Sequence, residues 1–405
     1  MPAATPLPRR PAVLMLGSAE DLLTGPGCPV CRYAGEAADR YLTWFALESH
    51  ARADTITRLC ASLGMCPRHT RALMRQPGAA IRLTAVYRYV LAAARDRLDG
   101  RLGRLERCPA CENDHSATDR AVETLVEGLA DDRTRVRYRE LGGLCLPHLR
   151  AASARSDRRL AAWLSVTATT AAAATDHDAQ ARAALRQQAM ASSQPAGQAC
   201  CACWAAGRAE SDRLMQMMRA ASARPAGHRW LLCAGHLGDL VVLAGRRTAV
   251  TLAWQAGCLA EGMVRRRGAA GHMPCGPAGW VRSWGRRGDD RDACPVCKTA
   301  GDAARRAVDD VRYSLDVPPP VPGQHTSLCV RHVLFLQRMD QRAGQVMARC
   351  AAGRSETLLA ELDEAFGKNT WAGRHLARGP EMTAWRRAAA FLDGQVFCGG
   401  SPPDT

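Results

Sequence analysis

Sixteen cysteine and histidine residues of this chain form eight short motifs with the spacing of metal ligands. Each motif reads CxxC or CxxH, and the two kinds alternate four times along the chain. Cysteine thiolates and histidine imidazoles are the usual ligands of zinc, and ligands with this spacing can bind one ion. The predicted ligands are Cys28, Cys31, Cys66, His69, Cys108, Cys111, Cys145, His148, Cys200, Cys203, Cys233, His236, Cys294, Cys297, Cys329 and His332.

Each CxxC and the CxxH that follows it define one copy of an internal repeat. Between the second and the third cysteine of a copy lie 34, 33, 29 and 31 residues. The residue before the third cysteine is always large and apolar, namely Met65, Leu144, Leu232 and Leu328. Agreement beyond the ligands indicates a true repeat. We therefore expect each copy to pair its own CxxC with its own CxxH around one ion, giving about four ions.

Both kinds of motif are expected at the start of a helix. The segment after each CxxC has apolar residues at helical spacing, as in residues 34–51, and a second helical stretch follows CxxH, as in residues 81–98 and 333–350. Proline follows the first cysteine at Pro29, Pro109 and Pro295, which suits the first turn of a helix. The free N–H groups there favour the thiolate that a metal needs.

The composition predicts an all-α fold of four metal-stapled helical repeats in two halves of two repeats. The chain has 405 residues, of which 47% are apolar and only 5% aromatic, and it is rich in good helix formers. The expected order is a flexible N-terminal segment (1–24), repeat 1 (25–104), repeat 2 (105–180), a linker (181–198), repeat 3 (199–264), a connector rich in glycine and arginine (265–292), and repeat 4 with C-terminal helices (293–398).

Three thiolates and one imidazole complete a tetrahedral zinc shell without an open position, and closed sites of this kind are structural as a rule. We therefore predict zinc at each site. An iron–sulfur cluster with the same ligands is the main alternative, and disulfides are a weaker one, because they would leave the histidines unexplained. In the third copy either Cys200 or Cys201 could pair with Cys203, and the spacing of the other copies favours Cys200. Cysteines outside the pattern are Cys60, Cys201, Cys258, Cys275, Cys350 and Cys398, of which we expect Cys60 and Cys350 to be buried thiols.

The charge and the missing catalytic motifs limit the function. The formal net charge is +16, which allows nucleic acid or an acidic protein as a partner. Trp280 and Trp284 lie among arginines in the connector, where they could stack on bases. No HExxH, P-loop, GxGxxG or GxSxG motif is present. We find no secretory signal or membrane span, so we expect a cytoplasmic protein without a membrane partner.

These features predict a noncatalytic zinc-binding scaffold that binds a macromolecule. The alternatives are an iron–sulfur or thiol redox accessory protein in a biosynthetic pathway and a nucleic-acid-binding protein. The repeated CPxC and LCxxH motifs, with Phe366, Trp371, Trp385 and the Leu392-Asp393-Gly394 tail, resemble an uncharacterised bacterial family of cysteine-rich helical proteins, a domain-of-unknown-function family. The resemblance implies a metal-bound helical architecture and no reaction. The missing proline at Cys200-Cys201-Ala202-Cys203 and the long connector depart from that pattern.

Overall fold

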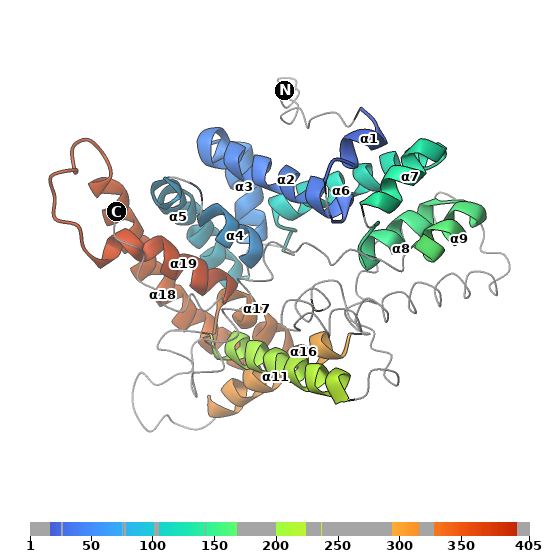
Figure 1. Cartoon of the computed structure of the whole chain (residues 1–405). Helices are drawn as coiled ribbons and strands as arrows, with labels where there is room; N and C mark the ends of the chain where they lie inside the picture. The colour runs from blue at the N-terminus through green and yellow to red at the C-terminus, as the bar shows by residue number, and fades with distance from the viewer. Residues whose placement is uncertain are drawn as a thin grey trace, which may run out of the picture. The chain divides into compact units, whose positions relative to one another are not determined.

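The structure is a computed structural model (Figure 1). It describes residues 17–25, 27–74, 76, 78–100, 105–141, 143–167, 200–223, 236, 294–315 and 328–394. All regular secondary structure in these ranges is helical, which confirms the all-α prediction. The segments expected as linker and connector, and residues 1–16 of the N-terminal segment, lie outside the described residues. No described helix has the length and apolar character that a membrane crossing requires.

The chain divides into two compact units whose limits differ from the limits of the expected repeats. Among the described residues, the first unit takes in 17–38 and 113–167, and the second takes in the remainder. The division cuts two long helices, α2 (Pro29–Trp44) and α6 (Pro109–Gly128). Segments that are far apart in the sequence therefore contribute to each unit.

The first unit contains helices that pack around buried leucines and one tyrosine. Its other helices are α1 (Ala19–Leu22), α7 (Asp132–Glu140), α8 (Leu146–Arg155) and α9 (Arg158–Thr167). The side chain of Asn113 on α6 donates a hydrogen bond of 3.1 Å to the carbonyl of Ala37 on α2, which places the two helices side by side. The buried Tyr138 hydroxyl accepts a bond of 3.2 Å from the N–H of Leu144. This bond fixes the chain just before the second CxxH.

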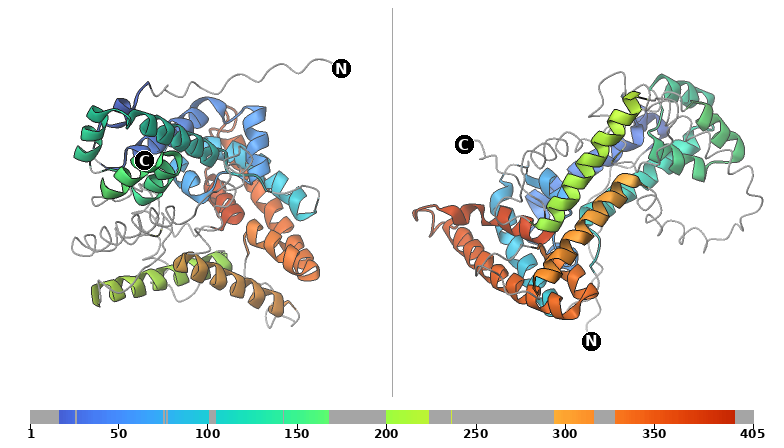
Figure 2. Two further views of the ribbon diagram at one scale, coloured as in Figure 1. Left: turned by 90° about the vertical axis from the view of Figure 1, so that its right-hand side faces the viewer. Right: turned by 90° about the horizontal axis from the view of Figure 1, so that it is seen from below.

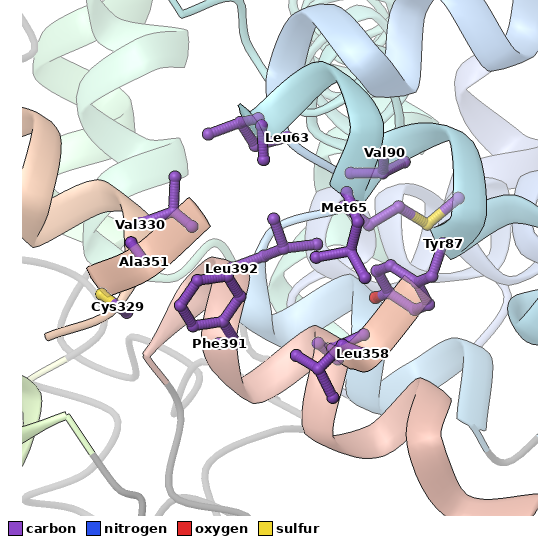
Figure 3. Close-up of a cluster of buried hydrophobic side chains, with 14 of the residues drawn as sticks. Leu63, Met65, Tyr87, Val90, Cys329, Val330, Ala351, Leu358, Phe391 and Leu392 are labelled. Atoms are coloured by element: carbon purple, nitrogen blue, oxygen red, sulfur yellow. The ribbon is translucent and has the colours of Figure 1, made fainter. Parts of the chain in front are cut away.

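The second unit is larger and holds helices from the first and last parts of the chain. They are the π-helix η1 (Phe45–Ser49), α3 (Ala53–Ser62), α4 (Pro67–Met74), α5 (Ala79–Leu98), α11 (Cys201–Ala223), α16 (Pro295–Ser314), α17 (Val330–Met339), α18 (Gln341–Lys368), the 3-10 helix η3 (Pro380–Thr383) and α19 (Ala384–Asp393). Figure 3 shows Phe391 and Leu392 of α19 in one apolar cluster with Tyr87 of α5 and Leu358 of α18. This cluster links the helix after the first CxxH to the helices after the fourth.

Helices α11 and α16 form a closely packed antiparallel pair, drawn side by side in Figure 2. The carboxylate of Asp310, near the end of α16, interacts electrostatically with the thiol of Cys201 at the start of α11. Farther along α11, Glu210 contacts His236, whose ring lies against Cys297 at the start of α16. The first turn of each helix therefore lies beside a later part of its partner.

The predicted helices after CxxC are confirmed, because α2, α6, α11 and α16 each begin within a CxxC motif. The stretch 81–98 lies within one helix, α5, as expected. The stretch 333–350 is a correction, because it contains two helices, α17 and α18. Asp340 has an extended backbone between them, and its carboxylate accepts a hydrogen bond of 3.0 Å from the N–H of Ala343. This bond caps the start of α18 and fixes the break.

Candidate metal centres

Every described motif begins with a cysteine that caps a helix. The carbonyls of seven first cysteines each accept a hydrogen bond from the N–H four residues later, over 2.8 to 3.1 Å. These cysteines are Cys28, Cys66, Cys108, Cys145, Cys200, Cys294 and Cys329. The prediction that both ligand pairs lie at helix starts is therefore confirmed for the described residues. Free N–H groups and the positive end of each helix dipole face the thiols, which stabilises negative sulfur.

Fifteen of the predicted ligands form four groups, in each of which all ligand atoms lie within 4.8 Å of one another. Site 1 is Cys28, Cys31, Cys145 and His148. Site 2 is Cys66, His69, Cys108 and Cys111. Site 3 is Cys200, Cys203, Cys329 and His332. Site 4 is His236, Cys294 and Cys297, and its predicted fourth ligand, Cys233, lies outside the described residues.

The predicted ligands are brought together, but the predicted pairing within a copy is wrong. Sites 1 and 2 exchange motifs between the first and second copies, and sites 3 and 4 exchange them between the third and fourth. Each CxxC therefore meets the CxxH of the other copy in its half. The expected two halves of two repeats correspond to these two reciprocal pairs of sites.

Helix length explains the exchange. A helix rises about 1.5 Å per residue, so the helices of 16 to 23 residues that begin at CxxC carry the chain about 24 to 35 Å away from their own first turn. The following CxxH lies beside a later part of that helix, as His236 contacts Glu210 in the middle of α11. A second helix that runs antiparallel to the first, as α16 does beside α11, brings its own CxxC to the same level, because Cys297 also contacts His236.

The interatomic distances fit one ion in the middle of each group. Contacts between Sγ and the histidine Nδ1 measure 3.1 to 3.7 Å, and contacts between two sulfurs measure 3.4 to 4.0 Å. A tetrahedral ion about 2.3 Å from sulfur and about 2.0 Å from nitrogen requires edges of about 3.5 to 3.8 Å. The four groups could therefore hold metal ions, with Nδ1 as the nitrogen ligand.

The same distances exclude disulfides at these positions. A disulfide places two sulfurs about 2.05 Å apart, whereas the sulfurs of Cys31 and Cys145, for example, lie 3.4 Å apart. The cysteines of the described residues are all free thiols.

Cys201, a neighbour of the third site, differs from the ligand Cys108 in the direction of its pKa shift. Hydrogen bonds with Cys111 and Cys66 lower the pKa of the Cys108 thiol to about 3. By contrast, burial raises the pKa of Cys201 to about 11, and the nearby charge of Cys200 adds to the shift. The thiol of Cys201 stays outside the ligand group, while Cys200 belongs to it. The preference for Cys200 over Cys201 is therefore confirmed.

A carboxylate supports the histidine of site 4. The Nε2 atom of His236 lies 3.2 Å from Oε1 of Glu210 on α11, while its Nδ1 faces the sulfurs of Cys294 and Cys297 at 3.4 and 3.3 Å. A carboxylate in this place holds the ring orientation and raises the basicity of the ligating nitrogen. Sequence reasoning missed Glu210, since nothing in the spacing relates it to His236.

We expect the substitution Glu210→Gln to weaken metal binding at site 4 about tenfold, because the amide keeps the shape but removes the charge that strengthens the ligand. Competition with a coloured chelator measures the affinity. The other three sites serve as an internal control and should keep their affinities, since the carboxylate acts on the histidine of site 4. Equal affinities at site 4 in both proteins would show that the carboxylate has no role there.

Gly394, at the end of α19, lies against two sulfurs of site 3. At Gly394, with φ of +71°, an added Cβ would lie 2.3 Å from Sγ of Cys203 and 2.7 Å from Sγ of Cys329. The neighbouring Asp393 accepts a hydrogen bond of 2.8 Å from Arg331, which lies between two ligands of the site in sequence. Burial raises the pKa of Asp393 to about 7, although the charge of Arg331 opposes the shift. The end of α19 therefore covers the sulfurs of Cys203 and Cys329.

The extra cysteines differ in exposure. Cys60 on α3 is half-buried and packs against the apolar cluster of the second unit, in line with the prediction. Cys350 on α18 is exposed, so its prediction as a buried thiol is wrong. It lies on the outer face of a helix whose apolar residues face the other way. Cys258, Cys275 and Cys398 lie outside the described residues.

Comparison with protein-family models, with curated proteins and with solved structures found no significant match. The family resemblance of the repeated motifs therefore stays a prediction. The assignment of the four sites depends on their geometry and on the chemistry of their ligands.

Proposed function

We propose that this chain is a noncatalytic zinc-binding scaffold in which four zinc ions hold pairs of helix starts together. The observation that carries the proposal is the closed ligand group, with three sulfurs and one nitrogen at tetrahedral distances in sites 1, 2 and 3. A shell of this kind has no position for a substrate or a reactive water. Each ion then stabilises the fold, and the surface of the folded protein binds its macromolecular partner.

The ligand distances favour zinc over an iron–sulfur cluster. A cluster contains several irons and attaches each ligand to one of them, so its ligands stand farther apart than the ligands of a single ion. All ligand atoms of a site here lie within 4.8 Å of one another. Three thiolates with one imidazole are also a common structural zinc shell. The redox alternative loses support for the same reason, because zinc has no accessible second oxidation state.

Metal analysis of protein purified without added metal tests the proposal. We expect about four zinc ions for each chain and a colourless solution. Removing them with a strong chelator should unfold the protein, because apparent zinc-binding free energies of about 10–16 kcal/mol in small domains are also folding free energies. Loss of helical circular dichroism measures the unfolding. A brown protein containing iron and sulfide, or a protein that stays folded without metal, would contradict the proposal.

A further inference from the structure

An exposed loop between α18 and α19 projects an aromatic side chain into solvent. The α18–α19 loop comprises residues 369–379 and is drawn in red in Figure 1. Trp371 has 77% of its surface exposed, the largest exposed fraction among the large apolar residues of the described ranges. Soluble proteins rarely leave a tryptophan so exposed without a use, and tryptophan is common at binding surfaces.

The loop is held in place at its base. Lys368, at the end of α18, binds the carboxylate of Glu381 at 2.9 Å, and the same carboxylate accepts a hydrogen bond of 2.7 Å from the N–H of Gly379. An added Cβ at Gly373 would lie 2.2 Å from the carbonyl oxygen of Gly367, so the loop folds tightly back on the helix end. A loop fixed in this way presents Trp371 without a large ordering cost on binding.

The charge of the loop is positive and uncompensated. It contains Arg374 and Arg378 and no acidic residue, and neither arginine forms an ion pair with a described residue. Two carboxylates close to the loop in sequence, Glu364 and Glu381, both bind Lys368, at 2.6 and 2.9 Å. The guanidinium of Arg374 lies 3.2 Å from the ring centroid of Trp371. The guanidinium of Arg374 thus lies over the face of the Trp371 indole, and Arg378 adds a second positive charge to the loop.

We propose that the α18–α19 loop binds single-stranded nucleic acid, with a base stacked on the Trp371–Arg374 pair and the flanking phosphates on the two arginines. Stacking on an aromatic ring together with cationic contacts to the backbone is how such strands are bound without sequence preference. The net charge of +16 attracts the same polyanion. The site is separate from Trp280 and Trp284 of the connector, which lie outside the described residues.

The small apolar area argues against a protein or a membrane as the partner. Within the loop only Trp371 and Leu376 are large and apolar, and Leu376 is 49% exposed. Phe366, at the end of α18, is 37% exposed, and the guanidinium of Arg88 lies 4.7 Å from its ring centroid. A stable protein interface requires a much larger buried apolar core.

Fluorescence anisotropy with a labelled oligothymidylate of about twelve nucleotides tests the proposal on the metal-loaded chain. We expect Trp371→Ala to weaken binding about tenfold, the loss of one stacked base. Changing both arginines of the loop to glutamine should reduce the slope of log affinity against log salt by about 1.4, because each phosphate contact contributes about 0.7. The metal content and the circular dichroism of these variants should not change, since the loop is exposed and is distant in sequence from every candidate ligand.

The matched control is an exposed aromatic residue beside an arginine whose charge is already paired with a carboxylate. Tyr313 is 62% exposed, and the guanidinium of Arg312 lies 4.6 Å from its ring centroid, but Arg312 pairs with Asp309 at 3.8 Å. Tyr313→Ala combined with Arg312→Gln should leave affinity for the oligonucleotide unchanged. Unchanged affinity in the Trp371→Ala protein would overturn the proposal.

Two further probes distinguish nucleic acid from the other anionic partners. Polyglutamate and phosphatidylserine vesicles carry negative charge without bases. If either of them loses affinity in the Trp371→Ala protein as strongly as the oligonucleotide does, base stacking is not the cause and the proposal is wrong. These outcomes are independent of the zinc proposal, because metal content is measured on the same samples.

Discussion

Replacing Cys28 and Cys31 by serine is expected to remove one bound ion and to expose Cys145, not Cys66, to alkylation. The reason is the exchange of motifs, since Cys145 and His148 share site 1 with the two replaced residues. A thiol released from a metal becomes reactive, whereas a bound one stays protected. Alkylation followed by mass spectrometry identifies the released cysteine, and metal analysis counts the ions.

Combined variants give this prediction a control that does not depend on alkylation. Adding Cys145→Ser and His148→Asn to the first variant should remove no further ion, because all four positions belong to one site. Adding changes at Cys66 and His69 instead should remove a second ion, because that pair belongs to site 2. The reverse result would restore the pairing within a copy and contradict the structure.

The substitution Gly394→Ala is expected to lower the free energy of unfolding by roughly 2–4 kcal/mol, as the sum of about 1 kcal/mol for a side chain at positive φ and about 1–3 kcal/mol for overpacking. The new Cβ would lie 2.3 Å from Sγ of Cys203, so α19 must shift or site 3 must distort. Urea unfolding measures the loss, and chelator competition should show weaker metal binding at site 3 alone.

Gly100 provides the matched control for this substitution. It has a similar φ of +77°, but an added Cβ would meet no atom within 4 Å. The substitution Gly100→Ala therefore carries the backbone cost without the contact with sulfur, and we expect it to cost only about 1 kcal/mol and to leave all metal affinities unchanged. Equal losses of unfolding free energy in the two variants would show that glycine is needed at position 394 only for its positive φ.

The exchange of motifs makes each half of the protein depend on both of its copies. Deleting one copy removes candidate ligands from two sites, since the CxxC and the CxxH of a copy belong to different groups. Single repeats should therefore not fold alone around one ion. This arrangement differs from the usual repeat protein, in which each unit has its own internal contacts and only nearest neighbours interact.

The sequence by itself determined the all-α class, the ligands and the positions of the motifs at helix starts. These properties are local: a CxxC or CxxH can be recognised from its own residues, and helical periodicity lies within one segment. The preference for Cys200 over Cys201 also followed from spacing alone. The break at Asp340 was missed, although an aspartate that can cap a helix is a local signal for such a break.

Only the tertiary structure decided which motifs share an ion, and it also revealed Glu210 and Gly394 as neighbours of the sites. Equivalent copies have equivalent ligands, so spacing along the chain cannot distinguish pairing within a copy from exchange between copies. The direction and length of the packed helices make that distinction, as α11 and α16 demonstrate. The same holds for Cys350, because the face of α18 that is buried depends on the helices packed against it.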